Sequence, residues 1–472
     1  MAGKGTLKMA LGVTKLEPIP TTPVTSRWRR IVTPIPAPES IPVIERLRAA
    51  EPQSMAGLPP ILWDQAEGFL VRDRFGNQWI DLTSGIVLAN AGHAHPRILE
   101  AIRSATEHRL LATYAFPSES RLKLLEKLVA LSPIPTSKAI LYSSGTEATE
   151  CALMLMRRHG QRIHPRKVGI VSLAGHYHGR TLAAHLASGM PQPTDWIERE
   201  RVDHFQIPAP HSLTFPWGKS HEGACGAECF QSSINALAER GVGQERIAGL
   251  ILEPVPGTTT MPIPLDFAAA AADWVQRHDV LLAFDEIQCG CGRTGRFFGG
   301  DHLGVTPDLI VLGKGLSSSL PVSAVIGRST LLDLPLPGEM SSTHGGNPVC
   351  AAAALANLQV LEDERLMEVA VRTGAAVLDR LRGLQRDLPQ RIRAVQGVGL
   401  FISVHLRRPD SDEPDVESAD AVAQAAVRRG VLMFTTGRGY LKFTPPLSID
   451  LEAALEAADV IRECLIERIS TP

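Results

Sequence analysis

Short apolar segments alternate with helical segments over residues 97–345, and this alternation constrains the fold more than any other feature of the sequence. The apolar segments are rich in valine, isoleucine and leucine, whereas the segments between them place apolar residues at helical spacing. This pattern predicts a mostly parallel sheet with helices on both faces. Ligands of such sheets bind beyond the carboxyl ends of the strands, so we expect the functional residues there.

The flanking segments predict a second, smaller α+β domain. Residues 61–90 show the alternation of a strand pair with a turn at 74–77, and the C-terminal part ends in a helical pattern over 450–468. The N-terminus is rich in proline, which interrupts helices and central strands. We expect a proline-rich arm at 1–44, the two parts of the small domain at 45–90 and 346–472, and a large domain at 91–345.

Composition and charge exclude several classes of protein. The 472 residues include 48 basic and 50 acidic side chains, and this balance offers no electrostatic footprint for nucleic acid or an anionic membrane. No apolar run approaches the roughly 20 residues that a membrane span requires, and the N-terminus has no secretory signal pattern. We therefore expect a soluble cytoplasmic protein that acts on small molecules.

The cysteines do not predict a disulfide framework or a metal centre. Seven cysteines, an odd number, are scattered along a long chain, so reduced thiols are expected. His221, Cys225 and Cys229 could supply three metal ligands, but no fourth stands at a typical zinc spacing. We interpret this segment as a surface loop and expect no metal.

The segment Ser143–Glu147 lies where the strand KAILYSS passes into a helix. The start of a helix offers free N–H groups and a positive dipole end, which suit a phosphate. Gly145 permits close approach of the backbone, and Thr146 adds a hydroxyl. An ordinary helix cap at Ser144 or Thr146 explains the same residues, so the motif alone leaves both uses open.

An acid and a lysine follow two other apolar strands. Asp285 ends the strand VLLAFDEI, where an acid needs a cationic or donor partner to stay ionised. A magnesium ligand or a structural ion pair is the alternative, although no GxxxxGK[ST] loop accompanies it. Lys314 follows the strand DLIVLGK between two glycines, where desolvation makes an amine nucleophilic. A single turn lysine is usually solvated, but all three motifs end neighbouring strands, which predicts a common site.

Five motifs in this order resemble the signatures of class III aminotransferases, which include 4-aminobutyrate, ornithine and acetylornithine aminotransferases. They are SSGTEATE, HYHGRT, LAFDEIQCGCGRTG, LGKGLSSSLP and THGGNP, and the resemblance runs from about residue 61 to 465. It implies pyridoxal 5′-phosphate (PLP) as the cofactor and the α/β fold of PLP-dependent transferases of fold type I. In this fold a large domain with a mostly parallel, seven-stranded type of sheet between helices is joined to a smaller α+β domain.

The resemblance also implies roles for individual residues. Lys314 matches the lysine that forms the internal aldimine, and Asp285 matches the acid that keeps the pyridine nitrogen protonated, so that the ring accepts electrons. The spacing agrees with the family pattern, since Lys314 lies 29 residues after Asp285 and 29 before Thr343. The other matches are Gly145 and Thr146 at the phosphate, Tyr177 on the ring face, Gln288 near the phenolic oxygen, and Thr343 reaching the phosphate from a neighbouring subunit.

The match to Thr343 implies a homodimer with shared active sites, with a tetramer as the larger alternative. Two residues depart from the family pattern. Thr258 follows EPVPG where many members have an acid, and Lys442 stands where its arginine partner would be. Lysine offers a point charge instead of a planar fork, so binding of an α-carboxylate should be weaker. Arg180 in HGRT is a second candidate substrate residue, with a structural role as the alternative.

The resulting hypothesis is a PLP-dependent aminotransferase that moves an amino group from an amine or amino acid to an oxo acid. An amino-acid racemase or epimerase with the same Lys314 site is the alternative, because the family also contains such enzymes. Decarboxylation is a weaker option. A catalytically silent binding protein is disfavoured because Lys314 and Asp285 are both present.

Overall fold

The computed structural model describes residues 16–55, 59–189, 197, 203–210, 226–435 and 437–470. The chain divides into two compact units, the larger formed by residues 88–91 and 95–370, the smaller by the described parts of 1–87, 92–94 and 371–472. The division falls after residue 370, whereas the sequence-based boundary of the large domain lies at 345. Helix α10 (Pro348–Asp363) belongs to the larger unit because it packs against α3 (Pro96–Glu107) and α4 (Glu119–Leu131).

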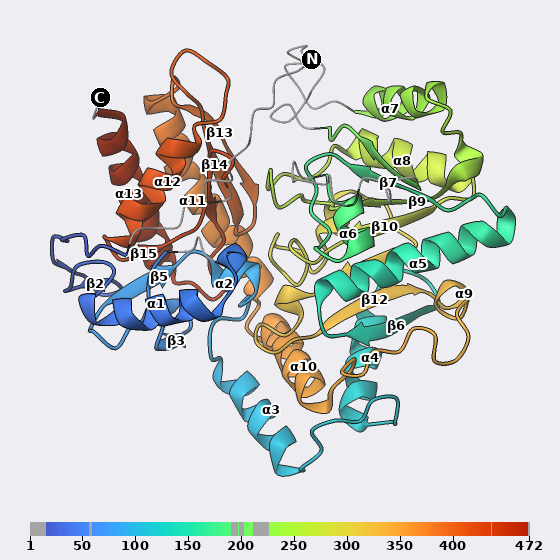
Figure 1. Ribbon diagram of the computed structural model, residues 1–472, viewed down its shortest axis with the longest axis horizontal. Helices are drawn as coiled ribbons and strands as arrows, with labels where there is room; N and C mark the ends of the chain where they lie inside the picture. Colours follow the sequence, from blue (N-terminus) through green and yellow to red (C-terminus); the bar gives the residue numbers. More distant parts are fainter. Residues whose placement is uncertain are drawn as a thin grey trace. The chain divides into compact units, whose positions relative to one another are not determined.

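A seven-stranded sheet forms the centre of the larger unit (Figure 1). Its strand order is β6-β12-β11-β10-β9-β7-β8, and only β12 runs antiparallel to its neighbours. This arrangement confirms the predicted mostly parallel sheet. The strands are β6 (Ser137–Tyr142), β7 (Gly169–Leu173), β8 (His204–Ile207), β9 (Ile247–Leu252), β10 (Leu281–Asp285), β11 (Leu309–Leu312) and β12 (Ser323–Arg328).

Helices cover both faces of this sheet, as expected (Figure 1). One core lies between the sheet and helices α7 (Ala227–Glu239) and α8 (Leu265–Arg277), and it includes Leu282 and Phe284 of β10. The other core lies against α5 (Gly145–Ile163) and includes Leu281 and Ala283. Successive strand residues point to opposite faces, so Asp285, the last residue of β10, continues the row that faces α5. The shorter helices of this unit are α6 (Leu182–Ala187) and α9 (Ser329–Leu332).

The smaller unit contains two sheets. The strand pair predicted around the turn at 74–77 is confirmed, with β4 (Leu70–Arg72) antiparallel to β5 (Gln78–Asp81). Trp79 of β5 is fully buried and donates its indole N–H to the carbonyl of Val427 at 2.8 Å. The other strands of its sheet are β1 (Val24–Thr25), β2 (Arg30–Ile31), β3 (Gln65–Glu67) and β15 (Val431–Leu432). The second sheet is antiparallel and consists of β13 (Ile392–Val398), β14 (Phe401–Leu406) and β16 (Tyr440–Phe443).

The helices of the smaller unit begin within the proline-rich segment, where α1 (Ile41–Ala50) follows the two-residue strands β1 and β2. Strand β2 pairs with β5, so part of the expected arm joins the sheet. Most of α11 (Leu366–Asp387) belongs to this unit, as do α12 (Val416–Val427) and α13 (Leu451–Ser470). Among the described helices, none is both long and apolar enough to span a membrane.

We predict that Phe267→Ala destabilises the larger unit by about 3–5 kcal/mol, because a buried ring is replaced by a cavity. Phe267 has no exposed surface, and its ring meets that of Phe230 edge-on at 5.3 Å between centroids. Leu265→Ala, at an exposed site on the same helix, is the matched control and should cost far less. Urea unfolding followed by circular dichroism measures both. Equal shifts of the two midpoints would contradict the packing described here.

Candidate active site

The sequence-predicted residues converge because they follow parallel strands of one sheet. Strands β6, β7, β9, β10 and β11 run in the same direction, so their carboxyl ends lie at one edge. A Cβ atom on Gly313 would lie 3.4 Å from the Cα of Gly145, which shows how closely two of these strand ends approach. The residues at or just after the strand ends include Gly145, Thr146, Tyr177, Glu253, Asp285, Gln288 and Lys314.

Asp285 is held by two hydrogen bonds, one to each carboxylate oxygen. Its Oδ2 lies 2.7 Å from Nδ1 of His178, and its Oδ1 accepts the backbone N–H of Ile287 at 3.1 Å. Only 1% of the residue is exposed. A carboxylate this deeply buried needs such donors to remain ionised. His178 and the N–H of Ile287 are therefore the partners that the sequence analysis expected for Asp285.

Lys314 has an unusual backbone and an unusual environment. Its φ of +41° lies in the left-handed region, which costs a non-glycine residue about 1–3 kcal/mol. Burial lowers the pKa of its amine, while the nearby Asp285 and Glu253 carboxyls oppose that shift. The lysine therefore combines a strained backbone with partial desolvation and two neighbouring acids. This combination is typical of a reactive amine and not of a solvated turn lysine.

Glu253 is a further member of the site that the sequence analysis did not identify as functional. It is buried after β9 and accepts the backbone N–H of Tyr177 at 2.7 Å and of Gly257 at 2.9 Å. Gln288 donates its side-chain N–H to the same carboxylate at 3.3 Å. Burial raises the pKa of Glu253, and the charge of Asp285 raises it further. Its position after an apolar strand is the signal that could have identified it, as for Asp285.

The start of α5 combines a helix cap with an open first turn. Ser144 and Glu147 form a capping box, so the cap that the sequence left open lies at Ser144. The N–H groups of Gly145 and Thr146 belong to the first turn, where a helix provides no acceptor for them. A Cβ on Gly145 would lie 2.9 Å from Cδ1 of Ile287. The turn therefore offers free donors and little room for a side chain.

The hydroxyl of Thr146 contacts the loop that follows β7. It lies 2.6 Å from the hydroxyl of Thr181 and accepts the backbone N–H of that residue at 3.3 Å. Gly179 passes close to it with φ of +139°, and a Cβ there would lie only 2.3 Å from Oγ1 of Thr146. The segment HYHGRT is therefore fixed against the start of α5.

The three remaining sequence candidates lie in different settings. Thr343 is exposed in a turn whose preceding residue, Ser342, donates to Glu147 at 3.3 Å, so this turn lies beside the start of α5. Arg180 is exposed after β7. Lys442 belongs to β16 of the smaller unit, where its ammonium lies 5.6 Å from the ring centroid of Phe401.

The cysteines differ from the expectation in one respect. Five cysteines of the described chain are free thiols, but Cys229 is disulfide-bonded, so the expectation of reduced thiols is wrong for this residue. His221 and Cys225 lie outside the described residues. Within the described ranges, no group of three or more histidine, cysteine or acidic side chains could hold a metal ion.

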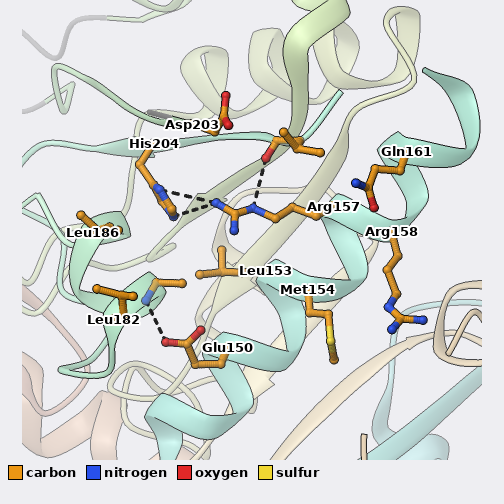
Figure 2. A pocket seen from close by; sticks show the side chains of 12 residues that line it. Glu150, Leu153, Met154, Arg157, Arg158, Gln161, Leu182, Leu186, Asp203 and His204 are labelled. Atoms are coloured by element: carbon orange, nitrogen blue, oxygen red, sulfur yellow. Dashed lines mark hydrogen bonds between the residues drawn. The ribbon is translucent and has the colours of Figure 1, made fainter. Parts of the chain in front are cut away.

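A cavity of about 630 Å³ lies elsewhere, along the outer side of α5 (Figure 2). Its charged side chains already have structural partners. Arg157 donates to the carbonyl of Val168 at 3.1 Å and lies 3.2 Å from the ring of His204, and Glu150 accepts N–H groups from the start of α6. None of the strand-end residues lines this cavity, so it is separate from the candidate active site.

Residues 53–465 match the family model described as aminotransferase class-III, so the chain belongs to the class III aminotransferases. It is therefore a PLP-dependent transaminase by family, as the motifs predicted. The chain is 33% identical to a 4-aminobutyrate aminotransferase of Mycobacterium leprae, over 93% of this chain and 98% of that protein. It is 29% identical to an alanine/serine racemase of Pyrococcus horikoshii, over 94% of each. The ornithine aminotransferase structure of Toxoplasma gondii superposes with a TM-score of 0.78 at 26% identity, over 91% of this chain and 95% of that chain.

We predict that Lys314 in the cofactor-free enzyme reacts with an amine-selective reagent at lower pH than an ordinary lysine, because burial lowers its pKa. Labelling at a series of pH values, quantified for each peptide by mass spectrometry, gives the midpoint for each lysine. Lys138, an exposed lysine of β6 paired with Asp333, is the internal reference. A Lys314 midpoint at or above that of Lys138 would contradict the expectation.

Proposed function

We propose that the strand-end residues of the larger unit form the PLP site of this aminotransferase, with Lys314 as the covalent attachment point. The observation that carries the proposal is the environment of Lys314, which joins a left-handed backbone to burial beside Asp285 and Glu253. A left-handed backbone is uncommon for a residue other than glycine, asparagine or aspartate.

The surrounding residues fit the parts of the cofactor. Gly145 and Thr146 would hold the phosphate, since the first turn of α5 has free N–H groups and little room for a side chain. Asp285 would pair with the ring nitrogen. Tyr177 would lie on the ring face and Gln288 near the phenolic oxygen, the former held through its backbone N–H and the latter through its side chain by hydrogen bonds to Glu253.

When bound, PLP supplies an electron sink for the carbanion that forms at the substrate carbon. The protein's own residues supply the proton transfers and the orientation. Lys314 would act as the base at the substrate's α-hydrogen, and its lowered pKa favours the neutral amine that this role requires. The two hydrogen bonds of Asp285 would orient its carboxylate.

Lys314→Ala should abolish covalent attachment of the cofactor, because no other amine is proposed to bind it. Borohydride reduction followed by peptide mapping should fix PLP to the Lys314 peptide of the native enzyme and to no peptide of the variant. Lys138→Ala, at an exposed site, is the control and should retain the label. A reducible adduct that persists in Lys314→Ala would show that another lysine carries the cofactor.

The substrates are proposed to be an amine or amino acid as donor and an oxo acid as acceptor. Thr258 is buried and uncharged, and the ammonium of Lys442 lies near two rings, those of Phe401 and Phe434. Neither residue offers the planar fork that grips a carboxylate bidentately. We therefore propose weak recognition of 2-oxoglutarate through Lys442, and Arg180 as the alternative carboxylate-binding residue.

Racemisation is the second candidate because the Pyrococcus horikoshii relative, which aligns over nearly the whole chain, is an alanine/serine racemase. In racemisation the proton returns to the substrate's Cα, whereas in transamination it does not. The residues at the strand ends serve either reaction. Decarboxylation is the weaker alternative.

We expect single-turnover transamination when the enzyme is mixed with amines and amino acids and no acceptor is added. The cofactor absorbance should then change, and one equivalent of oxo acid or aldehyde per site should be released, because the amino group stays on the cofactor. Absorbance spectroscopy and product analysis measure both. Retained absorbance with loss of optical activity in an amino-acid substrate would instead establish the racemase.

A homodimer with shared active sites, or a tetramer built from it, is proposed as the assembly. Thr343 is exposed beside the start of α5, where a residue could serve a neighbouring subunit. Several large apolar side chains are exposed in α4 and in the segment before it, and an exposed apolar cluster is typical of an interface. They are Leu110, Leu111, Tyr114, Phe116 and Leu122. The cytoplasm is the proposed compartment, supported by the free thiols but not by the disulfide of Cys229.

A further inference from the structure

Asn357 is a polar residue in the middle of α10, on a stretch of the helix that is otherwise apolar. Residues 351–358 of this helix are alanine and leucine apart from Asn357, and Asn357 itself has no exposed surface. Asparagine is a poorer helix former than alanine, and burying its amide costs free energy unless the amide is hydrogen-bonded. Its presence at this position therefore indicates a specific partner.

The partner of Asn357 is the short 3₁₀ turn Lys314–Leu316. The amide Nδ2 of Asn357 donates to the carbonyls of Gly315 and Leu316, each at 2.9 Å. Two carbonyl acceptors require the two hydrogens of an NH₂ group, which identifies the end of the amide that faces them. The other end, Oδ1, is buried and has no hydrogen-bond partner among the described residues. Asn357 therefore acts on this turn through its two donors.

These two hydrogen bonds lie directly after the strained backbone of Lys314. A left-handed φ of +41° persists in a non-glycine residue only where the surrounding structure enforces it. The turn contributes one backbone bond of its own, from the N–H of Leu316 to the carbonyl of Gly313 at 2.9 Å. Without Asn357, the buried carbonyls of Gly315 and Leu316 would lose these donors. Rotation of their peptide planes would expose them to other donors, and it would redirect the side chain of Lys314.

A second asparagine packs closely against the same turn. A Cβ atom on Gly315 would lie only 2.3 Å from Nδ2 of Asn90. Asn90 is itself fixed, because it donates to the carbonyl of Cys291 at 2.8 Å and accepts from Arg293 at 2.7 Å. The turn therefore has little freedom where it meets Asn90, and Asn357 supplies the hydrogen bonds to its carbonyls.

We propose that Asn357 is a positioning residue for the reaction, which holds the carbonyls of Gly315 and Leu316 so that the amine of Lys314 stays directed into the active site. This inference rests on the proposed function, in which Lys314 is the attachment point of PLP. It assigns no contact between Asn357 and substrate or cofactor.

The test replaces the amide by side chains that cannot donate. Asn357→Leu is similar in size, and Asn357→Ala suits the alanine-rich helix. In the cofactor-free enzyme, both should raise the pH midpoint for labelling of Lys314 toward that of Lys138, because the amine leaves its buried position. Stopped-flow absorbance after addition of PLP should show attachment slowed by about 10- to 100-fold, the effect expected for two buried carbonyls that lose their donor.

Two control variants separate positioning from general destabilisation. Asn235→Leu makes the same change at an exposed site of α7 and should alter neither readout. Phe267→Ala removes a buried ring that packs on Phe230, so it should lower the urea midpoint but leave labelling and attachment of PLP unchanged. The inference is wrong if Phe267→Ala reproduces the effects of the Asn357 variants, or if both Asn357 variants keep the native midpoint and rate.

A measurement on the native chain covers the case in which neither Asn357 variant folds. In the cofactor-free enzyme, the backbone amides of residues 315–318 should exchange their hydrogens as slowly as those of β11, because the turn is held from α10. Exchange as fast as in an exposed loop would overturn the inference.

Failure of the inference and failure of the proposed function give different results. Borohydride mapping of PLP to a lysine other than Lys314 would refute the proposed function. An unchanged labelling midpoint and attachment rate in the Asn357 variants, with PLP still mapped to Lys314, would refute the role of Asn357 alone.

Discussion

The common direction of five strands is the constraint on which the candidate site depends. Because β6, β7, β9, β10 and β11 are parallel, residues separated by more than a hundred positions in sequence follow strand ends at one edge. A single antiparallel strand, β12, fits between β6 and β11 without disturbing this arrangement. The two apolar cores, one on each face, hold the strands in register, so the site inherits its geometry from packing that contains no catalytic group.

Polar contacts then link the strand ends into one network. Glu253 joins the loop that carries Tyr177 to the side chain of Gln288, and His178 joins the same loop to Asp285. These bonds form among buried and half-buried groups, where an unpaired polar atom is costly. Such a network favours one arrangement of its members strongly over alternatives. A substitution within it should therefore act on several site residues together.

The sequence predicted the larger unit well where a clear apolar strand pattern leads directly into a candidate site residue. The apolar strands before Asp285 and Lys314 have strong patterns, and the parallel sheet follows from their alternation with helices. Strand β8 (HFQI) was not predicted because it is a short strand at the edge of the sheet with a polar residue in its middle. The pairing of β15 with β5 joins segments about 350 residues apart, which no local pattern encodes. The contact of His178 with Asp285 and the contacts of Glu253 depend on which groups meet in space, so residue type alone did not reveal them.

The left-handed backbone of Lys314 has a consequence for how such an enzyme evolves. The strain at this position is relieved by glycine, which adopts φ of +41° without penalty, so losing the lysine would make the fold more stable. Selection for stability and selection for chemistry therefore act in opposite directions on this one residue. Descendants that no longer need catalysis would tend to replace this lysine and gain stability. A lysine that persists here therefore indicates a chain that is still selected for its chemistry.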